Sequence, residues 1–561
     1  MGEKLITKIL SIGAAITTIL VVSGSVTDPV NTPKFLAIGV TGFAALGVLF
    51  YSGATTLLGK YKLVLTIVSL FIGSMLIAVF SSESPISQNL YGSYGRNNGL
   101  LAYLFLTSIF VTALALKSSI HFESIIRALL IAGLINVMYC LWVIGFGDFI
   151  GWSNPYGNIL GTFGNPNFVG SFLGMFFTSY LAFALSKSSS KTMKYSLLIV
   201  LPVTAFEIYE SHAIQGRVVA ALGIGILGFL LIRSKFGNGA TLGYVFASSV
   251  AGLFALLGAL QIGPLTNYIY KTSVSLRGQY WLAGWNTGES HPISGVGMDS
   301  FGDWYRRSRD VHAIELPGVN VVVNAAHNVP LDMFAFGGWP LLLTYLLIMS
   351  LAGVAAVRLI IRNKTYDPIL AVLVTAWVGY QLQSIISINQ IGLAVWGWLL
   401  SGALIAYERA NREVAQENTQ QGGQQRKKLA QAAVQPKLIL ASSIGAIVGL
   451  LIALPPLTSD TKWRSAQLDR TLPSLEATMK SGYFNPQNST KFLANIQILE
   501  SSNLLDLSRK YALEAVKWNP EDFNLWKILY LIQKSTPDEK DLAVENMKRL
   551  DPLNPDVTSI Q

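Results

Sequence analysis

Charged residues are scarce in this sequence. Only 13% of its 561 residues are Asp, Glu, Lys or Arg, whereas 51% are hydrophobic, and soluble proteins carry roughly 25% charged residues. A water-exposed surface could not accommodate so many apolar residues. The shortage of charge therefore excludes a soluble multidomain enzyme.

Cysteine is scarcer still. The single Cys140 lies inside an apolar run, which excludes an intramolecular disulfide and any multi-cysteine metal site. The loops predicted to lie outside the membrane also lack an Asp-x-Asp pair and a short-spaced cluster of acidic or histidine ligands. Asp299 and Asp303 are the nearest approach to such a cluster. We therefore expect no metal ion and no other cofactor.

Long apolar runs are abundant instead, and the mean hydropathy is +0.46. Runs of about 17 to 22 residues are long enough to cross a bilayer as helices. The first run is interpreted as a span and not as a signal peptide, because no clear small-x-small cleavage site follows it. The sequence predicts an all-α polytopic membrane bundle with about thirteen spans, near residues 5–22, 35–53, 62–80, 99–116, 124–144, 167–185, 194–209, 217–232, 241–260, 338–357, 368–387, 391–407 and 438–455.

Basic residues are distributed unevenly between the two sides of this bundle. If the amino terminus is cytoplasmic, almost every Lys- or Arg-rich loop faces inward, and the opposite short loops hold only Lys34, Arg96 and Arg217. This asymmetry is typical of membrane proteins. The net charge of +10 is thus explained by topology, and no nucleic-acid partner is expected.

The same pattern divides the chain into regions. We expect a transmembrane catalytic domain at 1–409, within which residues 261–337 form a long extracytoplasmic loop. Loops of this length are usually functional. A Gln-rich cytoplasmic linker at 410–436 and a last transmembrane helix at 437–455 should follow, which would place the tail, 456–561, outside the cytoplasm.

The tail contains a repeated Asn-Pro pair. The pairs begin at Asn485, Asn519 and Asn554, which are 34 and 35 residues apart, the period of tetratricopeptide repeats. We predict two to three degenerate repeats, and an unrelated stack of helical hairpins is the alternative. Such repeats bind proteins on a concave face, so we expect the tail to recruit a peptide or protein partner and to carry no chemistry.

Two arginines at the outer face of the spans are candidates for binding a substrate. Arg96 lies in a turn, Tyr91-Gly-Ser-Tyr-Gly-Arg-Asn-Asn-Gly99, and Arg217 opens the eighth predicted span. Charges at these depths are costly unless they are used. A snorkelling interfacial arginine is the alternative for Arg96, and a plain membrane anchor is the alternative for Arg217.

The long loop adds two further candidates. Arg277 lies in a stretch with helical apolar spacing, and His327 precedes Pro330 at the start of the next span. A solvated charge and a capping or core histidine are the respective alternatives. We expect His291 to be structural, and His312 has no informative context.

Several of these motifs together resemble the O-antigen ligase family, which includes lipopolysaccharide ligases, O-antigen polymerases and bacterial protein O-oligosaccharyltransferases. The similarity covers roughly residues 1–407. Two positions depart from the family pattern, Phe336 in place of an acidic residue and Leu341 in place of a glycine. The motifs are Gly161-Thr-Phe-Gly-Asn-Pro-Asn-Phe168, Gln215-Gly-Arg217, Ser275-Leu-Arg277 four residues before Trp281, His291-Pro-Ile-Ser-Gly-Val-Gly297, and Ala326-His-Asn328 leading into Gly338.

This resemblance implies a GT-C-like glycosyltransferase in the prokaryotic cytoplasmic membrane. It would move a glycan from undecaprenyl diphosphate to a hydroxyl on an acceptor protein or lipid. The residues add that the reaction should be independent of metal, since the ligand cluster is missing, and inverting, since no outward nucleophilic carboxylate is evident for a double displacement. Arg217 and Arg277 would stabilise the departing diphosphate, because arginine binds phosphate oxygens bidentately. His327 would act as the catalytic base, and Arg96 and Asn328 would join the two arginines in substrate binding.

Two other functions stay open at this point. A polysaccharide polymerase would use the same residues with a lipid-linked glycan as acceptor, and the repeat-containing tail slightly favours a protein acceptor instead. A polar-lipid transporter or flippase would need charges inside its spans, and Glu207 is the one plausible intramembrane acid.

Overall fold

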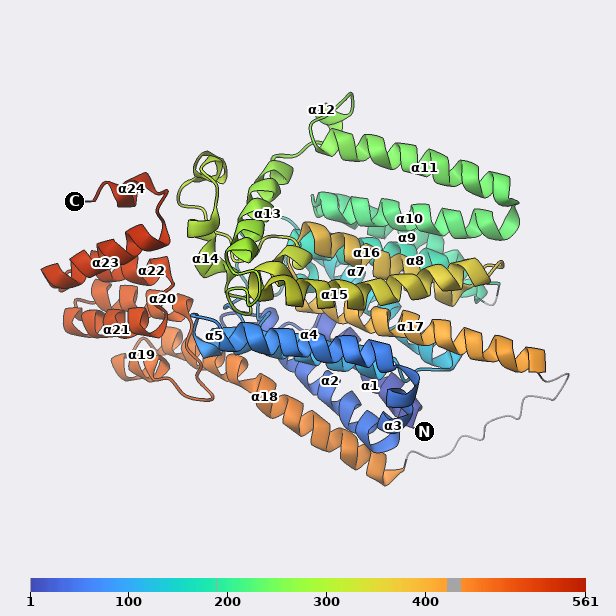
Figure 1. Cartoon of the computed structure of the whole chain (residues 1–561), viewed down its shortest axis with the longest axis horizontal. Helices are drawn as coiled ribbons and strands as arrows, with labels where there is room; N and C mark the ends of the chain where they lie inside the picture. Colours follow the sequence, from blue (N-terminus) through green and yellow to red (C-terminus); the bar gives the residue numbers. More distant parts are fainter. Residues whose placement is uncertain (1, 188, 421–434, 561) are drawn as a thin grey trace.

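The computed structural model describes residues 2–187, 189–420 and 435–560. These ranges are helical and contain no β-strand beyond one isolated bridge between Gly482 and Asn485. Figure 1 shows long helices running side by side, with shorter helices gathered at one end of the bundle. The predicted all-α polytopic membrane fold is confirmed.

Ten helices in the described ranges are long and apolar enough to cross a membrane. They are α2 (Asn31–Ser52), α4 (Lys62–Phe80), α7 (Ser119–Phe146), α8 (Pro166–Ala184), α10 (Ile214–Lys235), α11 (Asn238–Ala259), α15 (Val329–Arg362), α16 (Pro368–Ile386), α17 (Ile391–Gln420) and α18 (Pro436–Asp469). Each corresponds to a predicted span.

The other three predicted spans are also helices, α1 (Gly2–Ile19), α6 (Leu100–Ala113) and α9 (Lys191–Glu210). They are not among the ten, and α6 has only 14 residues. A total of thirteen spans therefore stays a prediction. The predicted linker at 410–436 begins inside α17, and its residues 421–434 lie outside the described residues.

Helices α2 and α18 pack closely although they lie far apart in the sequence. Glycines form the contact, since a Cβ on Gly449 would overlap the carbonyl oxygen of Gly39, and one on Gly445 would overlap that of Phe43. Small residues allow helix backbones to approach in this way within membranes. The contact fixes the last membrane helix, and with it the tail, against the amino-terminal part of the bundle.

Helix α15 begins nine residues before its predicted span and is interrupted near the start. The predicted loop therefore ends at Asn328 and not at 337. Gly337 and Gly338 leave the helical conformation, and Gly338 has φ +64°. Residues 292–297 fill the break: Val296 N–H donates to the carbonyl of Ala335 and Trp339 N–H to that of Pro292.

The long loop between α11 and α15 and the other connections contain short helices. They are α3 (Ala54–Lys60), α5 (Ile86–Tyr91), the 3-10 turn η1 (Gly161–Phe163), α12 (Thr266–Ile269), α13 (Thr272–Ser290), α14 (Phe301–Ser308) and η2 (Ile314–Gly318). The green and yellow-green helices α13 and α14 lie at the same end of the bundle as the tail (Figure 1).

The tail folds around an apolar core of its own, which includes Phe492, Tyr511 and Trp526. The starts of α20 and α22, at Ser489 and Phe523, are 34 residues apart; assignment to the tetratricopeptide class stays a prediction. The helices after α18 are α19 (Leu472–Met479), α20 (Ser489–Ser501), α21 (Leu505–Trp518), α22 (Phe523–Leu531), α23 (Pro537–Leu550) and α24 (Pro555–Thr558).

The tail is joined to the bundle without a break in the helix. We expected the last span to end at 455, but α18 continues through Pro455 and Pro456 to Asp469. Its outer part is held by packing, because Ser459, Asp460 and Trp463 are buried. Tertiary contacts thus outweigh the loss of backbone hydrogen bonds at the two prolines.

Buried ion pairs attach the tail to α14. Asp551, which is fully buried, accepts from Arg306 Nη1 and Arg309 Nη2, each at 2.7 Å. Asn519, the second of the Asn-Pro asparagines, donates to Asp303 at 3.1 Å. The tail is therefore fixed on the long loop by charged and polar groups removed from water.

Candidate active site

The turn that carries Arg96 is held in place by Asp299. One oxygen of this buried carboxylate accepts from the backbone N–H groups of Ser93, at 2.8 Å, and Asn98, at 3.2 Å. The turn begins at Gly92, whose φ of +85° favours glycine. Asp299, two residues after the motif at 291–297, thus fixes the turn around Arg96, a connection that spacing in the sequence did not predict. We call residues 91–99 the arginine turn.

Arg96 itself is partly buried, and its Nη1 atom is buried with no hydrogen-bond partner among the described residues. Burial lowers the pKa of its guanidinium, and the nearby carboxylates of Asp299 and Asp332 oppose that shift. The group therefore keeps an unused donor in a shielded position, which is an arrangement suited to binding a polar or anionic ligand.

His327 lies in a strained loop just before α15. Its φ is +56°, and its Nδ1 lies 3.1 Å from the carbonyl oxygen of Ala325. If Nδ1 carries the proton, as this contact favours, Nε2 is an acceptor. Asp332 supports the loop by accepting from Ala326 N–H at 2.7 Å, and the ring of Tyr280 packs 5.2 Å from the imidazole.

Two arginines act electrostatically on this histidine. Burial, together with the positive charges of Arg96 and Arg277, lowers the pKa of His327 to about 4, against the hydrogen bond to Ala325. The imidazole is therefore neutral at physiological pH. The two charges come from the arginine turn and from α13, and Trp281 of α13 donates to the carbonyl of His327 at 3.4 Å.

Arg277 and α10, the helix that carries Arg217, meet at the end of α16. Arg277 Nε donates to the carbonyl of Ile386 at 2.7 Å, and Gln215, two residues before Arg217, donates to the same carbonyl at 3.4 Å. Burial lowers the pKa of Arg277. Arg217 is exposed and forms no ion pair or hydrogen bond with the described residues. Its guanidinium is left available.

Asn328 has a local structural role. Its Oδ1 accepts from the N–H of Leu331 at 3.0 Å and so caps α15, with proline following in the first turn. This is the usual function of asparagine at a helix start. The cap accounts for an asparagine next to His327, because it fixes the start of α15 and with it the loop that carries the histidine. A substrate contact of Asn328 stays a prediction.

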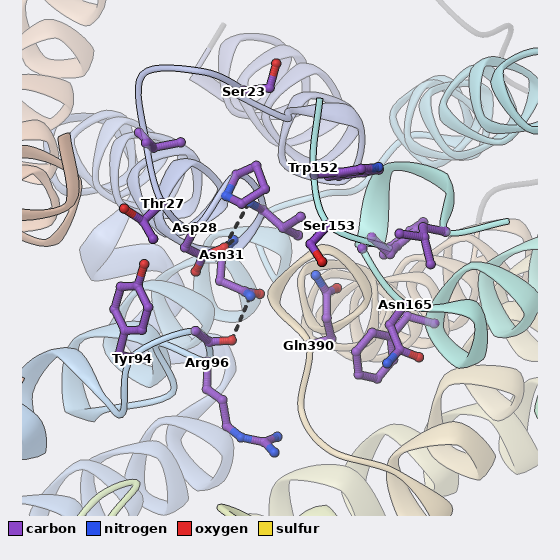
Figure 2. Close-up of a pocket in the computed structure, with 18 of the residues that line it drawn as sticks. Ser23, Thr27, Asp28, Asn31, Tyr94, Arg96, Trp152, Ser153, Asn165 and Gln390 are labelled. Atoms are coloured by element: carbon purple, nitrogen blue, oxygen red, sulfur yellow. Dashed lines mark hydrogen bonds between the residues drawn. The ribbon is translucent and has the colours of Figure 1, made fainter. Parts of the chain in front are cut away.

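A cavity of about 610 Å³ opens beside Arg96, within the range of small-ligand sites. Figure 2 shows Tyr94, Asp28 and Arg96 on one side and Trp152, Asn165 and Gln390 on the other. The motif at 161–168 contributes Phe163, Gly164, Asn165 and Phe168 to its wall. Arg277, Arg217 and His327 are not lining residues, but Asn324 is, three positions before His327.

The wall of this central cavity holds several polar atoms that lack partners. Besides Arg96 Nη1, these are Thr27 Oγ1, Asp28 Oδ2 and Gln390 Nε2, all buried and without hydrogen bonds among the described residues. Buried polar groups are normally satisfied. Both donors and acceptors are thus free in one cavity, as a ligand rich in hydroxyl groups would require.

The tail also reaches this cavity, which the sequence did not predict. Arg464, near the end of α18, is one of its lining residues and donates to the carbonyl of Gly24 at 3.2 Å. Asp460, one helical turn earlier, accepts from Tyr94 Oη at 2.7 Å and from the N–H groups of Thr27 and Asp28 at 2.8 Å. The extension of α18 therefore forms part of the site.

Sequence reasoning missed Thr27, Asp28, Gln390 and Arg464 because each lies in a loop or helix extension without a recognisable motif. A weak signal existed in the 145–166 loop, which lacks basic residues and supplies Trp152 to the cavity. Among the described residues no three His, Cys, Asp or Glu side chains form a metal-ligating group. Independence from metal stays a prediction.

Comparison with known proteins supports the resemblance seen in the motifs. Residues 174–346 match the family model described as O-antigen ligase. This segment contains Arg217, Arg277, His327 and the break in α15. No curated protein matches the chain. Over residues 174–346 the chain is therefore similar to the O-antigen ligase family, which supports a membrane glycosyltransferase of the ligase or polymerase type.

Proposed function

We propose that this protein transfers a glycan from undecaprenyl diphosphate to a hydroxyl group of an acceptor. The observation that carries the proposal is the central cavity, in which Arg96 and three further buried polar atoms lack protein partners. Free donors and acceptors together match the hydroxyl groups of a sugar. The arginines around His327 match the charge of a diphosphate.

In the proposed reaction the acceptor oxygen attacks the anomeric carbon as the bond from that carbon to the diphosphate breaks. One displacement of this kind inverts the configuration. Arg217 has a free guanidinium for the departing diphosphate, and Arg277, which the Ile386 carbonyl holds in place, adds positive charge. Positive groups beside a departing diphosphate lower the barrier because they stabilise charge as it develops.

His327 is proposed to take the proton of the acceptor hydroxyl. A base must be unprotonated at the working pH, and the lowered pKa of this imidazole keeps it so. With Nδ1 directed at Ala325, Nε2 is the atom that would accept. Asp332 and the Asn328 cap hold the loop that positions the ring.

Reconstitution tests this function. The full chain in nanodiscs is supplied with undecaprenyl-diphosphate-linked oligosaccharide and, in separate reactions, a serine- and threonine-rich peptide, a second lipid-linked glycan, or a small soluble alcohol. Mass spectrometry should find the glycan joined to at least one acceptor hydroxyl, with inverted linkage. Movement of donor across the bilayer without any new bond would contradict the proposal and favour a flippase.

A further inference from the structure

A second cavity lies between the tail and the membrane bundle. Its volume is about 160 Å³, and its walls come from α5, the arginine turn and α14 on one side and from the starts of α20 and α22 on the other. We call it the tail cleft. Tyr94 and Asn324 line both the tail cleft and the central cavity, so the two spaces adjoin at these residues.

Asp303, Arg306 and Asp522 bring charge to the lining of the tail cleft, which also contains many amide and hydroxyl side chains. One of them has an unused group: Gln487 is 5% exposed, its Nε2 donates to the carbonyl of Thr478 at 3.2 Å, and its Oε1 is buried without a partner among the described residues. The amide and hydroxyl residues are Gln88, Ser93, Asn324, Gln487, Asn488, Ser489, Thr490 and Asn524.

The aromatic residues of the tail cleft are already engaged with protein side chains. The guanidinium of Arg306 covers the ring of Phe523 at 4.2 Å, and Trp518 packs against Phe492 with ring centres 5.6 Å apart. A sugar is usually held by stacking on a free aromatic face, and an acyl chain needs an apolar wall. Some polar groups of the lining are engaged too, since Gln88 donates to Asp303 and Ser93 to the Asp299 carbonyl. The exposed side chains of Asn324, Thr490 and Asn524 are the donors and acceptors that match peptide groups.

The walls of the tail cleft are fixed in advance. Asp551 joins the tail to Arg306, one of the lining residues, and Asp460 joins α18 to Tyr94 at the boundary with the central cavity. Both links are buried or partly buried. A cleft held rigidly from both sides binds a flexible chain with a smaller loss of entropy.

We propose that the tail cleft binds an extended polypeptide segment of an acceptor protein and directs its serine or threonine hydroxyl past Tyr94 toward Arg96 and His327. The proposal rests on the proposed transferase function and specifies its acceptor. It assigns the tail a direct part in substrate binding, since Asn324 connects the tail cleft with the loop of His327.

A steric block of the tail cleft tests the proposal. Thr490 is exposed, lines the tail cleft and lies in the first turn of α20. Thr490→Trp should raise the KM for the serine- and threonine-rich peptide at least tenfold, and should lower the ratio of peptide transfer to small-alcohol transfer by a similar factor. Ser501→Trp, at the exposed far end of the same helix, is the matched control and should change neither quantity.

Photo-crosslinking gives an independent readout. A benzoylphenylalanine at the exposed, cleft-lining Asn524 should crosslink the peptide, and one at the exposed Glu545 of α23 should not. An unchanged peptide KM in Thr490→Trp, or a block that acts on the lipid-linked glycan acceptor instead, would overturn the proposal. Failure of the wild-type protein to glycosylate any acceptor would instead contradict the transferase function itself.

Discussion

His327 has the most informative charge state of the candidate residues. Because its pKa is lowered to about 4, the imidazole is already unprotonated above about pH 5, whereas an exposed histidine titrates near 6.5. We expect transfer to be nearly constant between about pH 5.5 and 8 and to fall as the pH drops through the pKa. His327→Gln should reduce turnover by about a hundredfold or more and leave donor binding intact.

Arg96 provides the control for this assignment. Its positive charge helps to lower the pKa of His327, so Arg96→Ala should raise that pKa and move the acid limb of the pH profile to higher pH. This shift is separate from any loss of donor affinity. An acid limb near pH 6.5 in the wild type would contradict the lowered pKa of His327, and a limb that Arg96→Ala leaves in place would mean that His327 is not the base.

Arg217 is predicted to bind the donor diphosphate. A hydrogen bond to a charged group is worth about 1.5 to 3 kcal/mol, so Arg217→Ala should raise the donor Kd by roughly 10- to 150-fold. Lysine should restore little, because it lacks the planar fork. Arg233→Ala is a matched control at the other end of α10, where Arg233 donates to the Ile361 carbonyl. Equal donor affinity in both alanine variants would exclude this role.

The arginines and the histidine could be selected as candidates from motifs, because ionisable side chains are rare in a chain with so little charge. The polar wall of the central cavity could not be found in that way. Thr27, Asp28 and Gln390 are ordinary loop residues in sequence, and they become notable only when folding buries them without partners. Such a property depends on contacts between distant segments.

At the scale of elements, the break in α15 is the feature most open to test. Gly338 has φ +64°, and a Cβ there would overlap the carbonyl of Pro292. With ψ −162° this conformation is essentially restricted to glycine, so Gly338→Ala should cost about 1 to 3 kcal/mol from backbone strain alone and should displace residues 292–297. We expect a lower Tm in detergent and loss of transfer.

Gly353 is the matched control in the same helix. A Cβ at this position would meet Trp377 at 3.5 Å, an ordinary contact, and alanine favours a helix by about 1 kcal/mol over glycine. Gly353→Ala should therefore keep or raise the Tm. The interpretation of the break would be wrong if both alanine variants behaved alike.

Apolar runs predicted the positions of the long helices well, because each run must be buried or face lipid. They did not predict where α15 begins or where α18 ends. An asparagine cap sets the start of α15 at Val329, and packing of Asp460 and Trp463 carries α18 past two prolines. Helix ends depend on such local and tertiary contacts, which hydropathy does not record.

At the scale of the whole molecule, the attachment of the tail depends on Asp551. Removal of one partner from a buried ion pair costs about 3 to 5 kcal/mol, and this carboxylate serves two arginines that are nearly or fully buried. Asp551→Ala should loosen the tail from α14, which hydrogen exchange of α14 amides would report. Asp506→Ala is the control, since its pair with Lys534 is exposed and worth less than about 1 kcal/mol. Equal exchange in the two variants would count against the attachment.

The last prediction concerns the orientation of the whole chain. The amino terminus and the tail lie at opposite ends of the bundle (Figure 1), and the end away from the tail carries basic residues paired with acids, such as Arg362 with Glu408 and Lys60 with Glu413. Basic loops stay in the cytoplasm, so we expect the tail outside.

With Cys140 replaced by alanine, an impermeant maleimide applied to intact cells should label Ser501→Cys in the tail. Lys364→Cys, between α15 and α16, should react only after the membrane is permeabilised. The reverse pattern, or equal labelling of both positions in intact cells, would contradict this orientation and place the cavity and the tail on the cytoplasmic side.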